Sequence, residues 1–280
     1  MRVRFMENED IDFALQLTSS EGWSDIRSDF EMLISHSPQA AFIALENGQS
    51  IGMISAVAYG TIGFIGSLIV LKDHRKKGIG TTLMKHAISY LESNQAMTMM
   101  LDAVPDAAPI YEGLGFKRCC KSLRLSGIPD ATEVRNVRKA TDDDLEGLLR
   151  LDERAFAGNR SHFLKHRYRE FPDLCYVIDS GEDRVDGFIM ASDRGSTVRI
   201  APWIISNHHE NAGDLINAVA RARKSQSLSI GVLETNQNAL DTLNRVGLHE
   251  KFFSIRMVRS RMEMPSFSNM MYSIGSPAKG

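Results

Sequence analysis

The sequence has few residues that would cross-link the chain or hold it in a membrane. Its 280 residues include three cysteines, Cys119, Cys120 and Cys175. Their odd number argues against a disulfide framework, and their spacing is not that of metal ligands, so we expect no metal. The first twelve residues carry early acids and no long apolar run, so we expect neither a signal peptide nor a transmembrane span. This composition places the protein in the cytoplasm.

An excess of charge of either sign is also lacking. The formal net charge is −2, with 43% hydrophobic and 24% charged residues, which is typical of a globular protein. Basic residues are not interleaved with stacking aromatics, so neither nucleic acid nor an anionic membrane is an expected partner. The length allows one large domain or two of ordinary size.

The stretch from Leu68 to Leu83 has the pattern of a phosphate-binding loop. A buried strand runs into a cationic loop containing Gly78 and Gly80, and a helix follows. Glycines let the backbone approach a ligand closely, and the first N–H groups of a helix point at an anion with the positive end of the dipole behind them. Further positive charge comes from Lys72, His74, Arg75, Lys76 and Lys77. The helix has one apolar face, made of Leu83, Met84, Ala87, Ile88 and Leu91.

Two common phosphate loops do not fit this stretch. A Walker A loop needs a lysine directly after its second glycine, but Thr81 follows Gly80. A dinucleotide fingerprint needs a small residue three positions after the second glycine, and Leu83 stands there. An ordinary basic turn before a helix remains open on this stretch alone.

A second motif lies about thirty residues downstream. Residues 106–116 read Asp-Ala-Ala-Pro-Ile-Tyr-Glu-Gly-Leu-Gly-Phe, a short helix bearing Tyr111 and followed by Leu-Gly-Phe. Together with the loop Arg75-Lys76-Lys77-Gly78-Ile79-Gly80, this order resembles the two signatures of the GNAT acyl-CoA-dependent N-acyltransferases. The resemblance covers residues 1 to about 126.

The resemblance implies a binding site for acetyl-CoA. In this family the strand before the loop splays from its neighbour, and its exposed backbone groups bind the pantetheine arm; here that segment is Leu68, Ile69 and Val70. The amide near Val70 would also stabilise the oxyanion. The loop amides that hold the pyrophosphate map to Arg75, Lys76, Lys77, Gly78, Ile79, Gly80 and Thr81.

The resemblance also implies direct attack of an amine on the thioester, which requires two proton transfers. The family's tyrosine maps to Tyr111, which would protonate the departing thiolate; packing of a half-buried aromatic is its other reading. For the base the candidates are Asp102, at the end of a strand, and Glu21, in the loop that borders the acceptor in this family. The other reading of both residues is a solvated or capping carboxylate. Trp23 and Tyr59 are either acceptor-lining or core residues.

The element pattern repeats in the second half. Gly247 follows Gly115 by 132 positions, and Leu215 follows Leu83 by the same number. This repetition predicts a duplicated domain. At that offset Arg75, Gly78 and Gly80 become Asn207, Glu210 and Ala212, and Tyr111 becomes Leu243. A carboxylate at position 210 would repel an anion, so we expect the second domain to have kept the fold and lost the site.

Local signals predict individual elements. Asn47-Gly48 joins two strands as a hairpin, and Ser28 to Glu31 and Thr141 to Asp144 read as helix caps. The expected organisation is a GNAT domain at 1–126, a linker at 127–136, a degenerate GNAT-like domain at 137–264 and a C-terminal tail at 265–280. Whether this tail docks or stays mobile is left open, with mobility as the default because of its Ser, Pro and Gly content. We expect an α/β (mixed α+β) fold in which each domain has a mixed, mostly antiparallel sheet flanked by helices.

The predicted activity is transfer of an acetyl group from acetyl-CoA to a primary amine. The acceptor would be a small molecule, such as an amino sugar, an amino acid or a polyamine, or a protein amine. An antibiotic-modifying enzyme of the same fold differs only in its acceptor. The alternative from another class is a non-catalytic acyl-CoA sensor. A homodimer is among the assemblies open to the chain.

Overall fold

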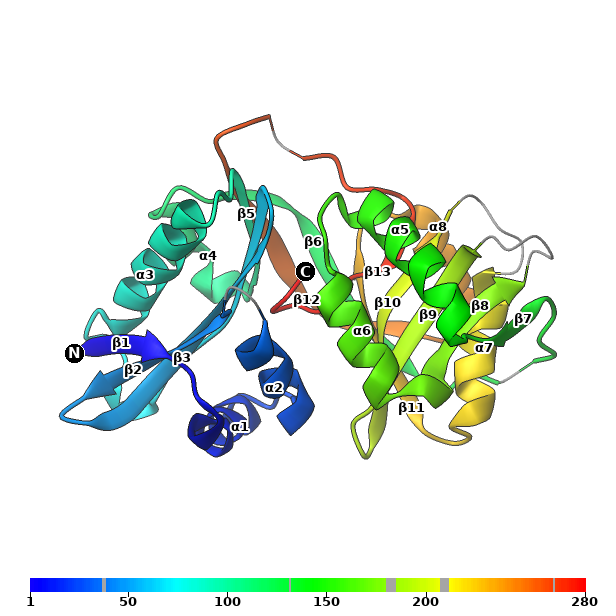
Figure 1. Cartoon of the computed structure of the whole chain (residues 1–280), viewed down its shortest axis with the longest axis horizontal. Coiled ribbons are helices and arrows are strands. Elements are labelled where there is room, and N and C mark those ends of the chain that lie inside the picture. Colours follow the sequence, from blue (N-terminus) through cyan, green and yellow to red (C-terminus); the bar gives the residue numbers. More distant parts are fainter. Residues whose placement is uncertain (37–38, 131, 180–184, 207–211, 264) are drawn as a thin grey trace. The chain divides into compact units, whose positions relative to one another are not determined.

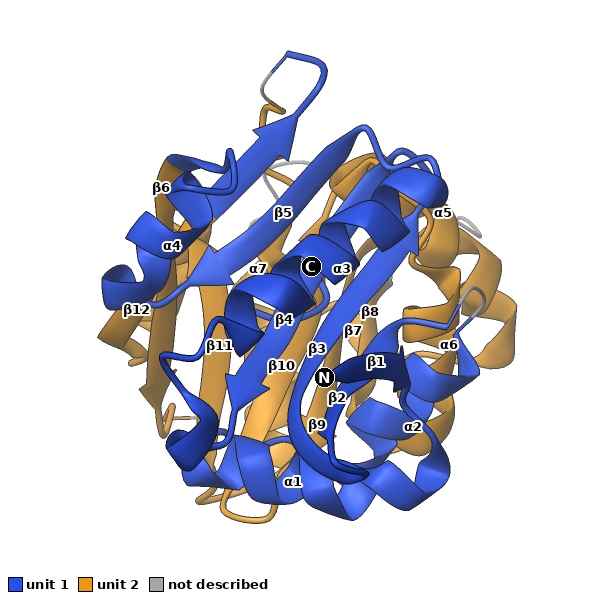
Figure 2. Ribbon diagram, turned by 90° about the vertical axis from the view of Figure 1, so that its left-hand side faces the viewer, with its two compact units in different colours: residues 1–118, 257–264, 277–280 blue, residues 119–256, 265–276 orange. Residues whose placement is uncertain are grey.

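A computed structural model gives the structure of the chain. It describes residues 1–36, 39–130, 132–179, 185–206, 212–263 and 265–280. The chain forms two compact units, coloured separately in Figure 2. Unit 1 comprises Met1–Arg118, Met257–Met264 and Pro277–Gly280, and unit 2 comprises Cys119–Arg256 and Pro265–Ser276.

Unit 1 is built on a mixed sheet whose strands follow the chain in the order β1-β2-β3-β4-β5. All neighbours pair antiparallel except β4 and β5, which are parallel. The bounds are β1 Arg2–Phe5, β2 Ala41–Glu46, β3 Gln49–Tyr59, β4 Ile62–Val70 and β5 Thr98–Ala103. The predicted Asn47-Gly48 turn joins β2 and β3, with positive φ at both residues as this hairpin requires.

Helices cover both faces of this sheet. Figure 1 shows α3 (Ile79–Ser93) against one face, with α1 (Ile11–Ser20) and α2 (Arg27–Ser35) against the other. The short helix α4 (Ala108–Glu112) follows β5. The predicted apolar face of α3 is buried along its length, because its residues recur at helical spacing.

Unit 2 repeats this arrangement. Its strands β7 to β10 form an antiparallel series, and β10 pairs parallel with β11. In Figure 1, α5 and α6 lie on one face of this sheet and α7 on the other. The strands are β7 Val137–Lys139, β8 Cys175–Asp179, β9 Val185–Asp193, β10 Thr197–Ile205, β11 Ser227–Leu233 and β13 Met271–Ser273. The helices are α5 Leu145–Phe156, α6 Ser161–Glu170, α7 Ala212–Ala222 and α8 Gln237–Arg245. The two mixed, mostly antiparallel sheets flanked by helices confirm the predicted fold class.

The last strand of each sequence repeat extends into the other compact unit. Strand β6 (Lys117–Gly127) ends the first repeat but pairs antiparallel with β11 in the sheet of unit 2. Strand β12 (His249–Ser260) ends the second repeat, but its last residues lie beside β5 in unit 1, where Ser260 Oγ is 2.8 Å from Thr98 Oγ1. The compact units and the sequence repeats therefore differ in these strands.

The duplication is also visible in side-chain contacts at the start of each repeat. In unit 1, Arg4 forms a two-pronged ion pair with Asp10, whose carboxylate also accepts the Glu7 backbone N–H. In unit 2, Arg138 pairs in the same way with Asp144, at the same separation in sequence. Each aspartate caps the helical segment that begins beside it.

This cap leads to a stability prediction. Asp144 accepts hydrogen bonds from Arg138 Nη1 (2.7 Å) and from the Thr141 backbone N–H (2.8 Å). The hydrogen bond from Arg138 holds the pKa of Asp144 below its usual range. We expect Asp144→Asn to lower the free energy of unfolding by about 1 kcal/mol at pH 7, the ordinary cost of losing a cap.

The effect should depend on pH with a definite sign. Because the pKa of Asp144 is depressed in the folded state, its contribution is present above the unfolded value of about 3.9 and is lost as the pH falls through the folded value. Urea unfolding of the wild type and Asp144→Asn should therefore differ at pH 7 and converge at low pH. Asp143→Asn, at an exposed neighbouring position, is the control. Equal losses in both variants would contradict the capping role.

One local sequence prediction was wrong. Helix α2 begins at Arg27, so Asp29 lies inside its first turn, where its carboxylate accepts the Ile26 backbone N–H at 3.1 Å; the cap was placed too late because Ser28 offered the stronger N-cap signal. Of the two possibilities left open for the tail, the structure shows docking. Met271–Ser273 forms β13 against β10, and Lys279 is buried. Within the described residues, no helix is long and apolar enough to cross a membrane.

Candidate functional site

The edge of unit 1 where β4 and β5 part is the first feature of the candidate site. Among the described residues, pairing between these strands runs only from Ile62↔Thr98 to Phe64↔Met100. Beyond that point β4 continues to Val70 without β5 beside it in register, which leaves backbone groups on its edge available to a ligand. This is the separation that the predicted pantetheine segment, Leu68–Val70, requires.

A bulge lies directly before that segment. Ser55 of β3 faces Gly66, and Met53 faces Ile69, so two β4 residues stand opposite one residue of β3. Ser67 has a φ of 49°, which places it in the left-handed region. Such a bulge re-aims the backbone groups that follow it.

The loop after β4 leads into α3 through Gly78, which has a φ of 81° and precedes the first helical residue, Ile79. Gly80 has no positive φ, and a Cβ built on either glycine would meet no heavy atom within 4 Å. The fold itself therefore gives no steric reason for glycine at position 80, although glycine lowers helix stability. Open space beside the N–H groups of a helix start fits a diphosphate.

Arg75 joins this loop to the end of α1. Its guanidinium donates to the Val70 carbonyl at 2.9 Å and pairs with the Glu21 carboxylate at 2.5 Å. The structure thus brings together three predicted site residues: one from the strand, one from the loop and one from the α1–α2 connection. The other loop cations, Lys76 and Lys77, are exposed.

Tyr111 lies on α4 and is half-buried, with its ring edge-on to Phe116 at 6.4 Å between centroids. Burial raises the pKa of Tyr111 above its ordinary value, so its phenol stays protonated at neutral pH. Asp102 is half-buried on β5, past the last residue paired with β4. Trp23, in the α1–α2 connection, is 40% exposed, whereas Tyr59 is buried.

The corresponding part of unit 2 differs. Ala212 is the first residue of α7 and is 3% exposed, so the position equivalent to Gly80 is closed by packing. Leu243, in the place of Tyr111, is fully buried in the core. The predicted counterparts Asn207 and Glu210, with His208 and His209, lie outside the described residues.

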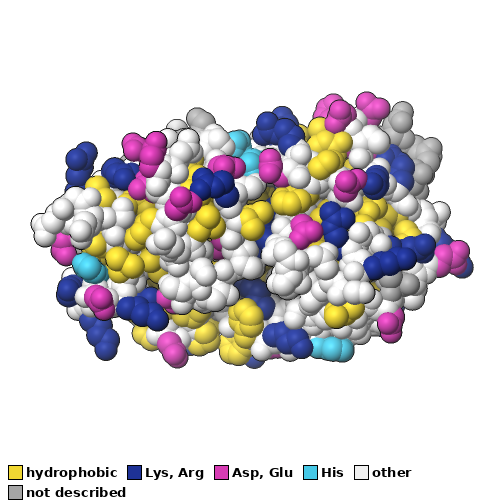
Figure 3. Space-filling view, turned by 90° about the horizontal axis from the view of Figure 1, so that it is seen from below, with side chains coloured by type: hydrophobic (Ala, Val, Ile, Leu, Met, Phe, Trp, Pro, Cys, Tyr) yellow, Lys and Arg dark blue, Asp and Glu magenta, His cyan; other side chains and the backbone are white. Residues whose placement is uncertain are grey.

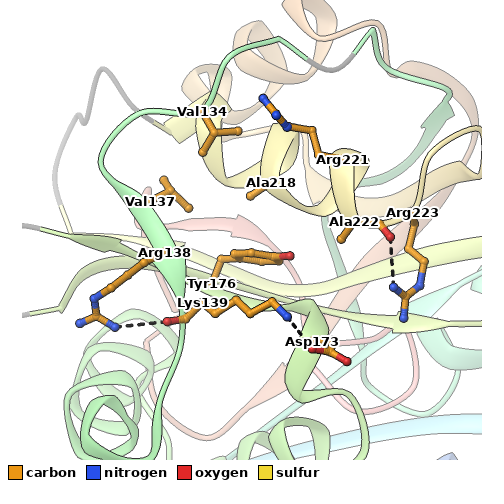
Figure 4. Close-up of a pocket in the computed structure, with 10 residues that line it drawn as sticks. All are labelled: Val134, Val137, Arg138, Lys139, Asp173, Tyr176, Ala218, Arg221, Ala222 and Arg223. Carbon is orange, nitrogen blue, oxygen red and sulfur yellow. Dashed lines mark hydrogen bonds and ion pairs between the residues drawn. The ribbon is translucent and has the colours of Figure 1, made fainter.

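Unit 2 also carries an open pocket of about 570 Å³. Figure 4 shows its lining, with the Lys139 ammonium reaching Asp173. Its other cations include Arg138, paired with Asp144, and Arg223, which is 3.3 Å from Asp193. Carboxylates therefore offset the charge of three of the four cations in the lining, the fourth being the exposed Arg221.

The surface gives no sign of a charged partner on the face that Figure 3 shows. Lys and Arg side chains there are interspersed with Asp and Glu. Among the described side chains visible on that face, no extended field of one sign is present. Long-range attraction of a polyanion would need such a field.

Sequence reasoning missed one group of residues in unit 1. Asp29, Ser55, Gly66 and Lys279 come together beside Tyr59. A glycine inside a strand, such as Gly66, is a weak signal of close backbone approach. No signal links Lys279 to residues more than 200 positions earlier in the sequence.

Comparisons with known proteins agree with this geometry. Residues 6–116 match the profile described as "Acetyltransferase (GNAT) family", and residues 148–273 match one described as "Acetyltransferase (GNAT) domain". The chain is 23% identical over 255 residues to the uncharacterized N-acetyltransferase YitH of Bacillus subtilis, covering 88% of this chain and 86% of YitH.

Solved structures share the fold. A candidate acetyltransferase of Pyrococcus horikoshii superposes with a TM-score of 0.82 at 19% identity, covering all of this chain and 95% of its own. A tandem GNAT protein from the clavulanic acid biosynthesis pathway has a TM-score of 0.60 at 11% identity, covering 94% of this chain and 100% of its own. At these identities the likeness extends to the fold.

Proposed function

Since the chain belongs to the GNAT family of N-acetyltransferases and carries two GNAT domains, we propose that unit 1 transfers an acetyl group from acetyl-CoA to a primary amine. The family uses acyl-CoA and an amine acceptor. In this proposal Leu68–Val70 bind the pantetheine arm and residues 75–81 bind the diphosphate. Unit 2 keeps the fold but has no acyl-CoA site.

One observation carries the assignment to unit 1: the open space at Gly80. Glycine at this position is required neither by backbone conformation nor by packing. A ligand that approaches the backbone supplies the missing reason, and the start of α3 offers it N–H donors. In unit 2 the equivalent residue, Ala212, is buried, so that position offers no such space to a ligand. This difference supports assigning the acyl-CoA site to unit 1.

The residues of unit 1 have separate tasks in this proposal. Acetyl-CoA supplies an acetyl group activated as a thioester. The amide near Val70 stabilises the negative charge that develops on the carbonyl oxygen when the amine nitrogen attacks. As the new C–N bond forms and the C–S bond breaks, Tyr111 gives its proton to the thiolate.

Asp102 takes the proton that the incoming amine must lose. It lies on β5 two residues past Met100, the last residue of that strand paired with β4. Glu21 is already held in the ion pair with Arg75. We therefore assign Glu21 to fixing Arg75 and the loop rather than to proton transfer.

The test is a screen of primary amines with labelled acetyl-CoA, following amide formation and thiol release together. We expect turnover with at least one amine and tight binding of CoA at a single site per chain. CoA binding without turnover on any amine would favour the non-catalytic sensor. Binding of two CoA molecules per chain would contradict the assignment of unit 2.

A further inference from the structure

A short segment of the chain, residues 277–280, lies in unit 1 against β3 and against β4, the strand that carries the predicted pantetheine segment. Ser55 Oγ of β3 donates to the Ala278 carbonyl at 3.3 Å, and the Tyr59 hydroxyl donates to the Lys279 carbonyl at 2.6 Å. On β4, a Cβ at Gly66 would lie 2.3 Å from Ala278 Cα. Gly66 thus provides the space that the segment occupies.

The side chain of Lys279 carries its charge into the interior. Its ammonium nitrogen is 3.2 Å from Asp29 Oδ1, and the two side chains are 3% and 5% exposed. Burying a charge is costly unless a partner of opposite sign meets it. Asp29, on the first turn of α2, is that partner, so unit 1 contains a built site for an alkylammonium group. We call Asp29, Ser55, Tyr59 and Gly66 the Lys279 site.

Part of this site lies on β4, the strand that also carries the predicted pantetheine segment. Gly66 directly precedes the bulge at Ser67, and Leu68 begins the segment assigned to the pantetheine arm. Since a strand rises about 3.3 Å per residue, Gly66 and Leu68 are separated by roughly 7 Å along β4. A reacting amine must come within about 3–3.5 Å of the thioester carbonyl, so the acceptor has to be held beside this strand. Here the chain holds an amine of its own, on a segment that packs against Gly66.

We propose that the Lys279 site is the acceptor-amine site of unit 1, and that Lys279 is a built-in competitor of the external acceptor. The inference rests on the proposed function and narrows the acceptor to a primary alkylamine, of the kind a lysine side chain carries, bound as its ammonium form by Asp29. An external amine enters when residues 277–280 leave.

Lys279 is held as an occupant rather than as a substrate. An ammonium group has no lone pair for attack, and the backbone carbonyls of Ala278 and Lys279 are fixed by Ser55 and Tyr59. The amine therefore cannot advance along β4 unless these hydrogen bonds break. A free alkylamine has no such tether, so it can give up a proton and approach the carbonyl.

The experiment uses n-butylamine, which reproduces the four-carbon stem and amine of lysine, with the full chain and its variants. Lys279→Met keeps the stem and removes the competing charge. We expect this variant to lower the KM for n-butylamine at least about tenfold, because the amine no longer has to displace Lys279 from Asp29. The kcat should stay within about twofold of the wild-type value. Calorimetry should show n-butylammonium binding at least about tenfold tighter, with or without CoA.

A double-mutant cycle separates competition from a structural role. Asp29→Asn should raise the KM, and adding Lys279→Met to it should bring no improvement, since both ammonium groups use the same carboxylate. Lys224→Met, at an exposed position of unit 2, is the matched control. The proposal would be overturned if Lys279→Met lowered the KM for n-butylamine equally in the wild-type and Asp29→Asn backgrounds. It would also be overturned if Lys279→Met lowered the KM in neither background.

Gly66→Ala provides a second route to the same answer. Its Cβ would displace Ala278, and with it the segment that carries Lys279, while leaving the Asp29 and Lys279 side chains themselves unchanged. It should therefore lower the KM for n-butylamine as Lys279→Met does. This variant also covers the case in which Lys279→Met destabilises unit 1. CoA affinity, measured in every variant, tests the proposed function separately. If the variants bind CoA but their KM and affinity for n-butylamine equal those of the wild type, the inference about the acceptor site fails while the proposed function stands.

Discussion

Replacing Gly80 by glutamate is expected to weaken CoA binding by at least about 100-fold while unit 1 stays folded. A carboxylate at this position would face the diphosphate. Two unit charges 4 Å apart interact by about 4 kcal/mol at an effective dielectric constant near 20, which corresponds to roughly a thousandfold in affinity before screening. Because no heavy atom lies within 4 Å of a Cβ here, the protein has room for the new side chain.

Calorimetric titration of CoA measures this effect, and circular dichroism checks the fold. Ser89→Glu adds the same charge to an exposed position later on α3 and should leave the CoA affinity within about twofold of the wild type, because exposed charges so far from the ligand are screened. Wild-type affinity in Gly80→Glu would show that the start of α3 does not bind the diphosphate.

Replacing Tyr111 by phenylalanine is expected to reduce kcat about 100-fold, at the low end of what general acid catalysis contributes. Phenylalanine preserves the ring and its edge-on contact with Phe116, so the fold and the CoA affinity should be unchanged. Tyr90→Phe is the control. It removes the same hydroxyl from a tyrosine of α3 that donates to the Gln39 carbonyl and that we assign no part in catalysis. Steady-state kinetics with a reactive amine gives the comparison.

The pH profile adds an independent check. Because burial raises the pKa of Tyr111, the acid form persists through neutral and mildly alkaline pH. Loss of kcat caused by its deprotonation should begin only above the ordinary tyrosine value of about 10. Unchanged turnover in Tyr111→Phe would remove Tyr111 from the mechanism.

Periodicity and turn chemistry predicted much of the fold. Strand β4 runs from Ile62 to Val70 as expected, because a buried apolar run bounded by turn residues leaves few alternatives. Asn47-Gly48 and Thr141 to Asp144 also act as predicted, since their signals are local. Helix α3 follows the loop as predicted and begins at Ile79, directly after the left-handed Gly78.

Long-range arrangements were not predictable in this way. An apolar pattern that is buried against one sheet would be buried equally well against another, so sequence alone does not say which sheet β6 and β12 join. The burial of Lys279 depends on Asp29, Ser55 and Tyr59, which lie at least 220 positions away in sequence. No pattern within a window of ordinary length can connect these residues.

The crystal structure of the chain with CoA is the most direct test of the central claim. We predict that the diphosphate lies against the backbone N–H groups between Arg75 and Thr81, with the pantetheine arm along Leu68–Val70, and that residues 207–212 carry no cofactor. CoA bound at residues 207–212, with the loop after β4 empty, would contradict the account.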